Sequence, residues 1–322
     1  MSRVWTAFYW LVLTLLALRF ADLHHGAGLE YPPATLDLLL AGKAASPFQY
    51  RVLSVGALAL LIGPLGLPRE AAILLLDWLA LLALLVLLDR LFRHFELDRR
   101  LARLAVALVF LPLLSLFVAL EYLRFWYPWD LVQIAFTAAA WLALLQRRPW
   151  LYAAVFLLAT VNRETSFLFA FLFLALYWPR WPLWRLGLAI ALQAAAWLAI
   201  KLAIQAAVGP LPGEGLAAFK LLDNLLSLVH QPVDSLVLLA AFGGAWLPVL
   251  IFWRRIPRAA LRRSLLAAPP FLAVLLVVAN LYEVRVLGEL VPLVWVPAAL
   301  LAAAWLGLDP PGRDRLGDPA AG

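Results

Sequence analysis

The chain has 322 residues, of which 66% are hydrophobic and only 14% are charged, and its mean hydropathy is +0.92. Charged residues make up about a quarter of an average soluble domain, so this composition excludes a soluble globular protein and predicts an all-α polytopic membrane protein. There are no cysteines, which excludes disulfides, thiolate catalysis and cysteine-based metal sites. The net charge of +7 comes from arginine-rich loops and indicates membrane orientation, not nucleic-acid binding.

The first apolar run covers residues 4–21 and follows one basic residue, Arg3. No small-x-small cleavage site precedes Asp22, so we interpret the run as a retained membrane helix and not as a signal peptide. The positive-inside rule then assigns the arginine-rich loops 89–103, 146–149 and 254–263 to the cytoplasm.

Counting apolar runs between these anchors predicts ten spans with both termini in the cytoplasm. This gives one transmembrane domain over 1–307, an outer loop over 209–232 with an amphipathic piece at 216–229, and a disordered cytoplasmic tail over 308–322. The expected spans are 4–21, 70–91, 101–120, 130–145, the two arms of 150–178, 183–208, 233–253, 265–281 and 286–307.

Residues 52–66 form a fifteen-residue apolar run that ends in Gly63-Pro64-Leu65-Gly66. If this run crossed the bilayer, the arginine-rich loop 89–103 would lie on the wrong side. We therefore expect an outer re-entrant or juxtamembrane helix. The alternative is eleven spans with an inverted N-terminus.

The run 150–178 has about 29 residues and carries Arg163 and Glu164 near its middle. It is too long for one upright span and short for two. Cytoplasmic arginines flank it on both sides, so we expect a hairpin whose outer tip is Asn162–Ser166. Arg163 then becomes a candidate phosphate clamp that Glu164 and Asn162 orient. The alternative is a buried ion pair with a purely structural role.

Other outer connections carry further candidates. Asp22 follows the first span and is a candidate general base, with His24 and His25 nearby to assist it or to hold a metal. Arg51 opens the re-entrant helix after Tyr50, where helix N–H groups already favour an anion. An interfacial snorkelling role is the alternative for Arg51.

Two more outer turns complete the set. Tyr127 lies in an aromatic loop, Trp126-Tyr127-Pro128-Trp129, before Asp130. We interpret this loop either as a membrane-interface belt with an acidic helix start or as a surface for sugar stacking. The last turn carries Glu283, Arg285 and Glu289 and repeats the pairing of arginine with glutamate.

Together these residues form an ordered series of motifs: Pro-Phe-Gln-Tyr-Arg-Val-Leu at 47–53, Tyr-Pro-Trp-Asp-Leu at 127–131, Asn-Arg-Glu-Thr at 162–165 and Glu-x-Arg-x-x-x-Glu-Leu-x-Pro at 283–292. The series resembles a group of largely uncharacterised bacterial multipass membrane proteins. It is more distantly similar to the GT-C superfamily of glycosyltransferases, which use polyprenyl-phosphate sugar donors.

The GT-C resemblance implies a catalytic acid in the first outer loop, which only Asp22 matches, with His24 and His25 where a second acid would stand. That departure puts a dependence on a divalent metal in doubt, and the residues identify no certain cofactor. The resemblance also implies basic outer residues on the donor phosphate: Arg163, Arg285 and then Arg51, with Glu164, Glu283 and Asn162 orienting them. Tyr50, Tyr127 and Asp130 would line the substrate site.

The expected function is therefore an inverting glycosyltransferase at the outer face of the bacterial inner membrane. Its partners would be a polyprenyl-phosphate-linked sugar and a lipid or glycan acceptor, with no nucleic acid. Two alternatives stay open: a lipid or polysaccharide transporter or flippase, and a non-catalytic membrane assembly subunit. The first alternative expects ionisable residues at mid-membrane and an internal repeat.

Overall fold

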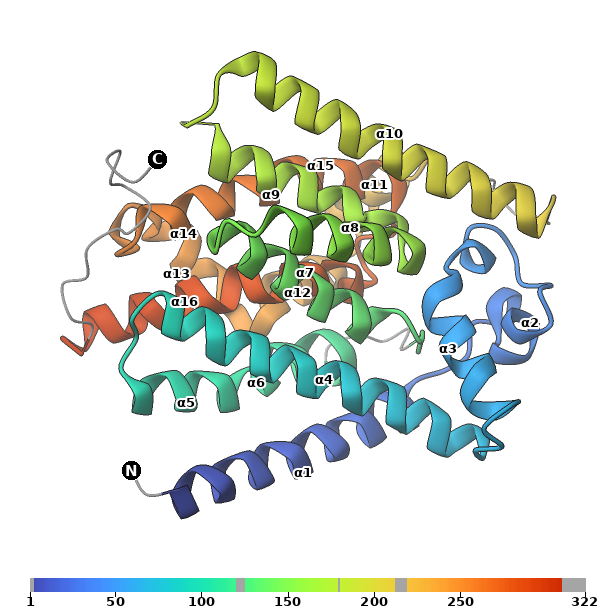
Figure 1. Ribbon diagram of the computed structural model, residues 1–322, viewed down its shortest axis with the longest axis horizontal. Coiled ribbons are helices and arrows are strands. Elements are labelled where there is room, and N and C mark those ends of the chain that lie inside the picture. Colours follow the sequence, from blue (N-terminus) through green and yellow to red (C-terminus); the bar gives the residue numbers. More distant parts are fainter. Residues whose placement is uncertain (1–2, 120–124, 179, 212–218, 309–322) are drawn as a thin grey trace.

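The computed structural model describes residues 3–119, 125–178, 180–211 and 219–308, and this part of the chain is a helical bundle without a strand (Figure 1). The expected tail 308–322 lies outside the described residues beyond Leu308. The helices are α1 (Arg3–Ala27), α2 (Leu36–Leu40), α3 (Val52–Ile62), α4 (Arg69–His94), α5 (Arg99–Leu108), α6 (Phe110–Leu114), α7 (Asp130–Leu145), α8 (Pro149–Asn162), α9 (Leu168–Tyr177), α10 (Leu183–Val208), α11 (Leu221–His230), α12 (Pro232–Ala240), α13 (Trp246–Ile251), α14 (Ala259–Ser264), α15 (Ala268–Val278) and α16 (Val291–Trp305).

Six helical segments in the described chain are long and apolar enough to cross a membrane. This confirms the expected class of protein, a helical membrane protein. The six segments are Arg3–Ala27, Arg69–His94, Arg99–Ala119, Leu183–Val208, Ala259–Val278 and Val284–Trp305.

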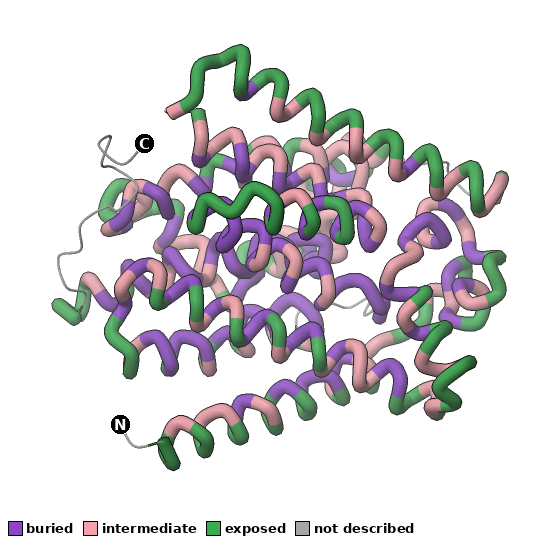
Figure 2. The backbone as a smooth tube through the Cα atoms, in the orientation of Figure 1, coloured by how far each residue is buried: buried purple, intermediate pink, exposed green. Residues whose placement is uncertain are grey.

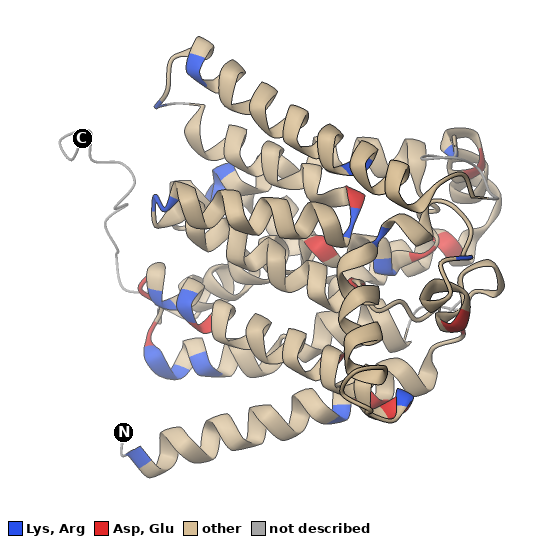
Figure 3. Ribbon diagram, turned by 45° about the vertical axis from the view of Figure 1, so that its right-hand side comes forward, with Lys and Arg blue, Asp and Glu red and all other residues tan. Residues whose placement is uncertain are grey.

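The ends of the bundle differ in charge. Many of the lysine and arginine residues lie at the end where α1 begins (Figure 3), which is also the end where α16 finishes (Figure 1). The α4–α5 and α7–α8 turns and the start of α10 lie at this end, which we call the basic end. The segment with α2 and α3 lies at the opposite end, which we call the distal end. The arginine-rich loops thus share one side, as the positive-inside rule requires of a polytopic protein.

Helix α7 forms the centre of the bundle, and α10 lies at its surface (Figure 2). Thirteen of the sixteen residues of α7 are buried, and it packs against α4, α8, α9 and α16. All of α10 is described, and only Leu186 and Lys201 are buried along its 26 residues. A helix that is this apolar and this exposed has the surface of a lipid-facing span.

Three expectations about individual segments are tested directly. Residues 150–178 form two helices, α8 and α9, which meet at Arg163 and the short 3-10 helix η4 (Glu164–Phe167), so the hairpin is confirmed. Helix α3 has 11 residues and is about 16 Å long, about half of the hydrocarbon thickness. It lies at the distal end, as expected of a juxtamembrane helix.

A continuous span over 233–253 was expected, and this expectation is wrong. The segment is divided into α12, a 3-10 turn η5 (Ala241–Gly244) and α13, and α12 with η5 is bent by 98° from α11. Phe242 and Gly243 have φ values of 58° and 65°, which an α-helix does not accommodate. Gly243 and Gly244 permit the break because neither carries a Cβ.

Candidate functional site

The candidate site is a buried ionic network centred on Asp130, the first residue of α7. Arg163 Nη1 donates to Asp130 Oδ1 at 3.0 Å, and Arg285 Nη1 donates to Asp130 Oδ2 at 3.2 Å. The three side chains are at most 5% exposed. A first-turn acid is favourable at a helix start, and two guanidinium groups further stabilise its charge. The expected acidic helix start is therefore found, and it is part of an ionic network.

Arg163 reaches a second carboxylate. Its Nη1 lies 3.7 Å from Glu289 Oε1, and Glu289 is 1% exposed. The Thr165 hydroxyl donates to the same carboxylate oxygen, and Gln133 Nε2 contacts the other at 3.5 Å. Glu289 belongs to the seven-residue 3-10 helix η8 (Val284–Leu290), so the network joins α7, the hairpin tip and the segment before α16.

Glu164 was expected to orient Arg163, and this pairing is wrong. Both carboxylate oxygens of Glu164 accept from Arg51, with Nε to Oε2 at 3.0 Å and a second bond from Nη2 to Oε1. Arg163 has extended backbone (φ −156°, ψ 145°), and Glu164 starts a 3-10 helix. Successive side chains diverge in extended backbone, so the two neighbours point to different partners.

Two of the three arginines, Arg51 and Arg285, also lie against aromatic rings. The guanidinium carbon of Arg51 is 4.7 Å from the Trp129 ring centre and 5.2 Å from that of Phe48. The guanidinium carbon of Arg285 is 4.2 Å from the Tyr127 ring centre. Such cation–π contacts gain strength when the cation is desolvated.

This arrangement corrects the expected role of the aromatic loop 126–129. Trp126, Tyr127 and Trp129 are at most 4% exposed, so they form neither a membrane-interface belt nor an open sugar platform. Tyr127 stacks on Phe48 and Trp129. Burial raises the pKa of the Tyr127 phenol well above its usual value, because the charged phenolate is poorly solvated there.

Asn162 connects three backbone segments inside the same network. Its Nδ2 donates to the Trp129 carbonyl at 3.1 Å and to Gln133 Oε1 at 3.0 Å. Its Oδ1 accepts from the Ser54 hydroxyl of α3 at 2.5 Å. Asn162 therefore positions Gln133 and the aromatic loop, and it contacts the arginines only indirectly.

Two further expected residues join the network at its edge. Glu283 accepts a hydrogen bond from Arg285 Nη2, as expected. The Tyr50 hydroxyl donates to the carbonyl of Gly209 at 3.4 Å, at the end of α10. Tyr50 thus links the segment that carries Arg51 to the lipid-facing helix α10.

The residues of the first outer connection lie apart from the network. Asp22 is 52% exposed and pairs with Arg19 one helical turn earlier. Within the described part of the chain, no hydrogen bond or ion pair joins Asp22 to Arg163. His25 is partly exposed and lies 3.6 Å from Glu70. Asp22 and His25 thus pair with residues near the distal end of α1, whereas Arg163 pairs with Asp130 and Glu289.

His24 is buried and belongs to a second polar group. Its Nδ1 lies 2.8 Å from Asp77 Oδ2, and the same oxygen accepts from Trp126 Nε1 at 3.1 Å. Asp77 is fully buried in α4. Among the described residues no group of three or more histidine, aspartate or glutamate side chains has an arrangement that holds a metal ion.

Sequence reasoning missed several members of the network. Gln133 and Thr165 are ordinary polar residues in apolar runs, and only their three-dimensional neighbours reveal their role. Lys201 had a usable signal, because a cation away from the ends of an apolar membrane helix is rare without a function. Its ammonium is buried and has no hydrogen-bond partner in the described chain.

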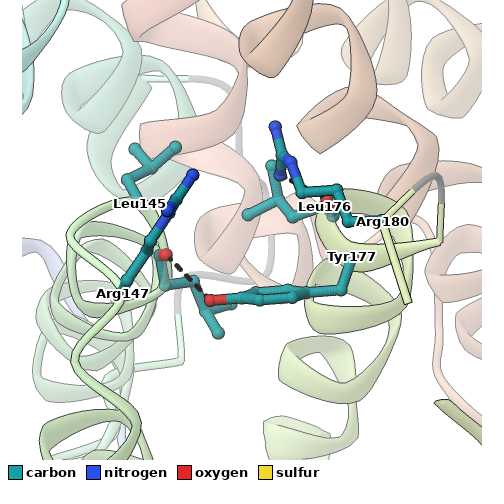
Figure 4. Close-up of a pocket in the computed structure, with 6 residues that line it drawn as sticks. Leu145, Arg147, Leu176, Tyr177 and Arg180 are labelled. Atoms are coloured by element: carbon teal, nitrogen blue, oxygen red, sulfur yellow. Dashed lines mark hydrogen bonds between the residues drawn. The ribbon is translucent and has the colours of Figure 1, made fainter. Parts of the chain in front are cut away.

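A small pocket lies between α7 and α9 at the basic end (Figure 4). Leu145, Arg147, Leu176, Tyr177 and Arg180 line it, and the Tyr177 hydroxyl donates to the Leu144 carbonyl at 3.3 Å. Its volume of about 10 Å³ accommodates about one water molecule. It is thus too small for a sugar or a lipid headgroup.

Comparison with protein-family models, curated proteins and solved structures found no match for this chain. The case for a function therefore rests on the buried network and on the sequence motifs that supply it.

Proposed function

We propose that this protein is a membrane glycosyltransferase that moves a sugar from a polyprenyl-phosphate donor to a lipid or glycan acceptor with inversion. The observation that carries the proposal is the convergence of Arg51, Arg163 and Arg285, from three distant segments, in one buried network at the ends of membrane helices. Buried arginines are expensive in a membrane protein and are kept mainly for function. Guanidinium groups also suit phosphate recognition.

In this proposal the fold is GT-C-like, with one extra helix outside the bilayer and ten spans, one of which is the broken segment of α12, η5 and α13. The shorter helices α7, α8 and α9 count as spans in this proposal. Burial supports this for α7, in which 13 of 16 residues are buried, because an enclosed helix does not need to match the bilayer thickness. The basic end and both chain termini face the bacterial cytoplasm. The distal end lies on the opposite side of the inner membrane.

The proposed reaction is a single displacement. The acceptor hydroxyl oxygen attacks the anomeric carbon while Asp22 takes the hydroxyl proton. The bond between the anomeric carbon and the phosphate oxygen breaks, and that oxygen leaves with the electron pair as polyprenyl phosphate. The arginine network stabilises the charge that develops on the departing phosphate, which is a large term in such reactions.

The role of Asp22 rests on its position in the last two turns of α1 (Arg3–Ala27), since its partner in the structure is Arg19. A substitution of Asp22 therefore tests its chemical role alone, because its exposed side chain is replaceable without disturbing the core. Asp37 offers a matched control, since it is a 77% exposed acid that also pairs with an arginine.

The test uses the full chain in proteoliposomes with a panel of undecaprenyl-phosphate-linked sugars and a mixed acceptor extract. Release of undecaprenyl phosphate is measured because it is common to every sugar and acceptor. Asp22→Asn is expected to lower release by at least about 100-fold, and Asp37→Asn is expected to match the parent protein. Full activity of Asp22→Asn removes that residue from the mechanism, and no release from any donor refutes the transferase.

A lipid transporter is the second candidate function. Asp77 in α4 and Lys201 in α10 are charged residues inside membrane-spanning helices and are at most 4% exposed, which is a feature of transport pathways. Movement of a lipid-linked sugar across the proteoliposome membrane without covalent change would favour this function. Absence of both transfer and transport would favour an assembly subunit.

A further inference from the structure

Lys201 is a buried cation beside the network, and its ammonium group makes no hydrogen bond within the described part of the chain. The residue is 4% exposed. An ammonium group has three donors, and burying it unpaired is costly. By contrast, Arg51 gives two hydrogen bonds to Glu164, and Arg163 gives one to Asp130.

The surroundings of Lys201 are both charged and close to lipid. Glu164 and Arg51 are the charged groups that act on its ammonium. One turn earlier on α10, Trp197 Nε1 donates to the Glu164 carbonyl at 2.8 Å, which fixes α10 against the hairpin tip. On either side of Lys201, Leu198 and Leu202 are 49% and 51% exposed.

The local charge at α10 is positive. Arg51 and Lys201 contribute two cations, and Glu164 contributes one carboxylate that already accepts two hydrogen bonds from Arg51. Lys201 lies seven residues before the end of α10 at Val208, or about 10 Å along the helix axis. With the end of α10 taken as the membrane boundary, Lys201 lies within reach of a lipid headgroup that enters sideways between the helices.

We propose that Lys201, together with Arg51, binds the phosphate of a membrane lipid that enters beside α10. A phosphate supplies several acceptor oxygens to the three unused ammonium donors and offsets the local positive charge. The lipid tail lies along the exposed leucines of α10. The choice of a polyprenyl phosphate as probe rests on the proposed function, whereas the lipid-phosphate site itself does not.

The test measures binding to the full chain in nanodiscs with three probes: undecaprenyl phosphate, undecaprenol, which lacks the phosphate, and inorganic phosphate. Native mass spectrometry and titration are the readouts. Undecaprenyl phosphate is expected to bind at least about tenfold more tightly than the other two. Equal binding of undecaprenol, or equal binding of inorganic phosphate, would overturn a lipid-phosphate site.

Lys201→Met provides the decisive variant because methionine keeps most of the side-chain volume and removes the charge. It is expected to weaken undecaprenyl phosphate binding at least about tenfold and, without ligand, to unfold at the same or a higher temperature than the parent protein. Lys43→Met removes the same charge from an exposed position and is expected to change neither property. Unchanged binding by Lys201→Met, or a lower unfolding temperature without ligand, would show a structural lysine instead.

The glycosyltransferase and the lipid-phosphate site at Lys201 can be refuted independently of each other. Binding that depends on Lys201, with no sugar transfer from any donor, leaves the lipid-phosphate site standing and refutes the transferase. Sugar transfer whose KM for the donor is unchanged in Lys201→Met leaves the transferase standing and refutes this site.

Discussion

Asp130 and Arg285 lie 155 residues apart in the chain, and yet Arg285 Nη1 donates to Asp130 Oδ2 at 3.2 Å inside the protein. The bond ties the start of α7, the central helix, to the last turn before α16. Arg163 donates a hydrogen bond to the other carboxylate oxygen of Asp130. This one aspartate therefore joins the hairpin tip to the C-terminal part of the bundle. The consequence for stability is measurable.

Asp130→Asn is expected to lower the free energy of unfolding by about 3–5 kcal/mol, because it leaves two buried guanidinium groups without their shared anion. Thermal unfolding in detergent, followed by tryptophan fluorescence, measures the loss. Glu70→Gln is the control, since Glu70 is 69% exposed and exposed pairs contribute little. An unfolding temperature as high as that of the control would show that Asp130 does not stabilise the network.

The Arg51–Glu164 pair is expected to show strong coupling in a double-mutant cycle. Arg51→Met and Glu164→Gln should each destabilise the protein by about 3–5 kcal/mol, and the double variant should cost at least about 1 kcal/mol less than their sum. The exposed pair Arg69 and Asp37 supplies the comparison cycle, with a coupling of about 0–1 kcal/mol. Additive losses at Arg51 and Glu164 would contradict the two-point pairing.

Gly288→Ala is expected to destabilise the contact between η8 and its neighbours. A Cβ at this position would meet Phe117 Cζ at 2.8 Å and Ile134 Cδ1 at 3.2 Å, and overpacking of this kind costs about 1–3 kcal/mol. Gly187→Ala in α10 is the matched control, because nothing lies within 4 Å of its added Cβ. Thermal unfolding of the two variants compares them, and equal stability would mean that η8 shifts freely.

The absence of native cysteines allows membrane orientation to be tested with single cysteines. Lys43→Cys lies on the distal side and is exposed, and Arg93 at the basic end is 58% exposed. A membrane-impermeant maleimide added to intact spheroplasts should label Lys43→Cys and should label Arg93→Cys only after permeabilisation. The reverse pattern would mean that the basic end faces outward.

The sequence predicts the helical elements better than their contacts. Loop arginines and run lengths correctly predict the hairpin at Arg163 and the short helix α3, because both follow from local composition and bilayer thickness. They do not predict the partner of Glu164, since Arg51 is 113 residues away and a single sequence carries no signal for that distance. Proximity in the chain instead suggested Arg163, which points elsewhere because its backbone is extended.

The same limit explains the aromatic loop and α12. Tryptophan and tyrosine beside a predicted span suit an interface belt, but Trp129 is fully buried because Phe48 and Arg51 cover it. The break near Gly243 was hidden inside an apolar run of sufficient length. Hydropathy alone does not distinguish a straight span from two helices joined at a glycine pair.

The shared aspartate also has a consequence for biogenesis. At a synthesis rate of about 5–20 residues per second, Arg163 follows Asp130 after about 2–7 seconds, and Arg285 follows after about 8–30 seconds. Between these two times only Arg163, one of the two arginines that bind Asp130, has been synthesised. The partly synthesised bundle therefore contains an incomplete ionic network. We expect a nascent chain truncated before Arg285 to be a preferred target for membrane quality-control proteases, and the full-length chain to escape them.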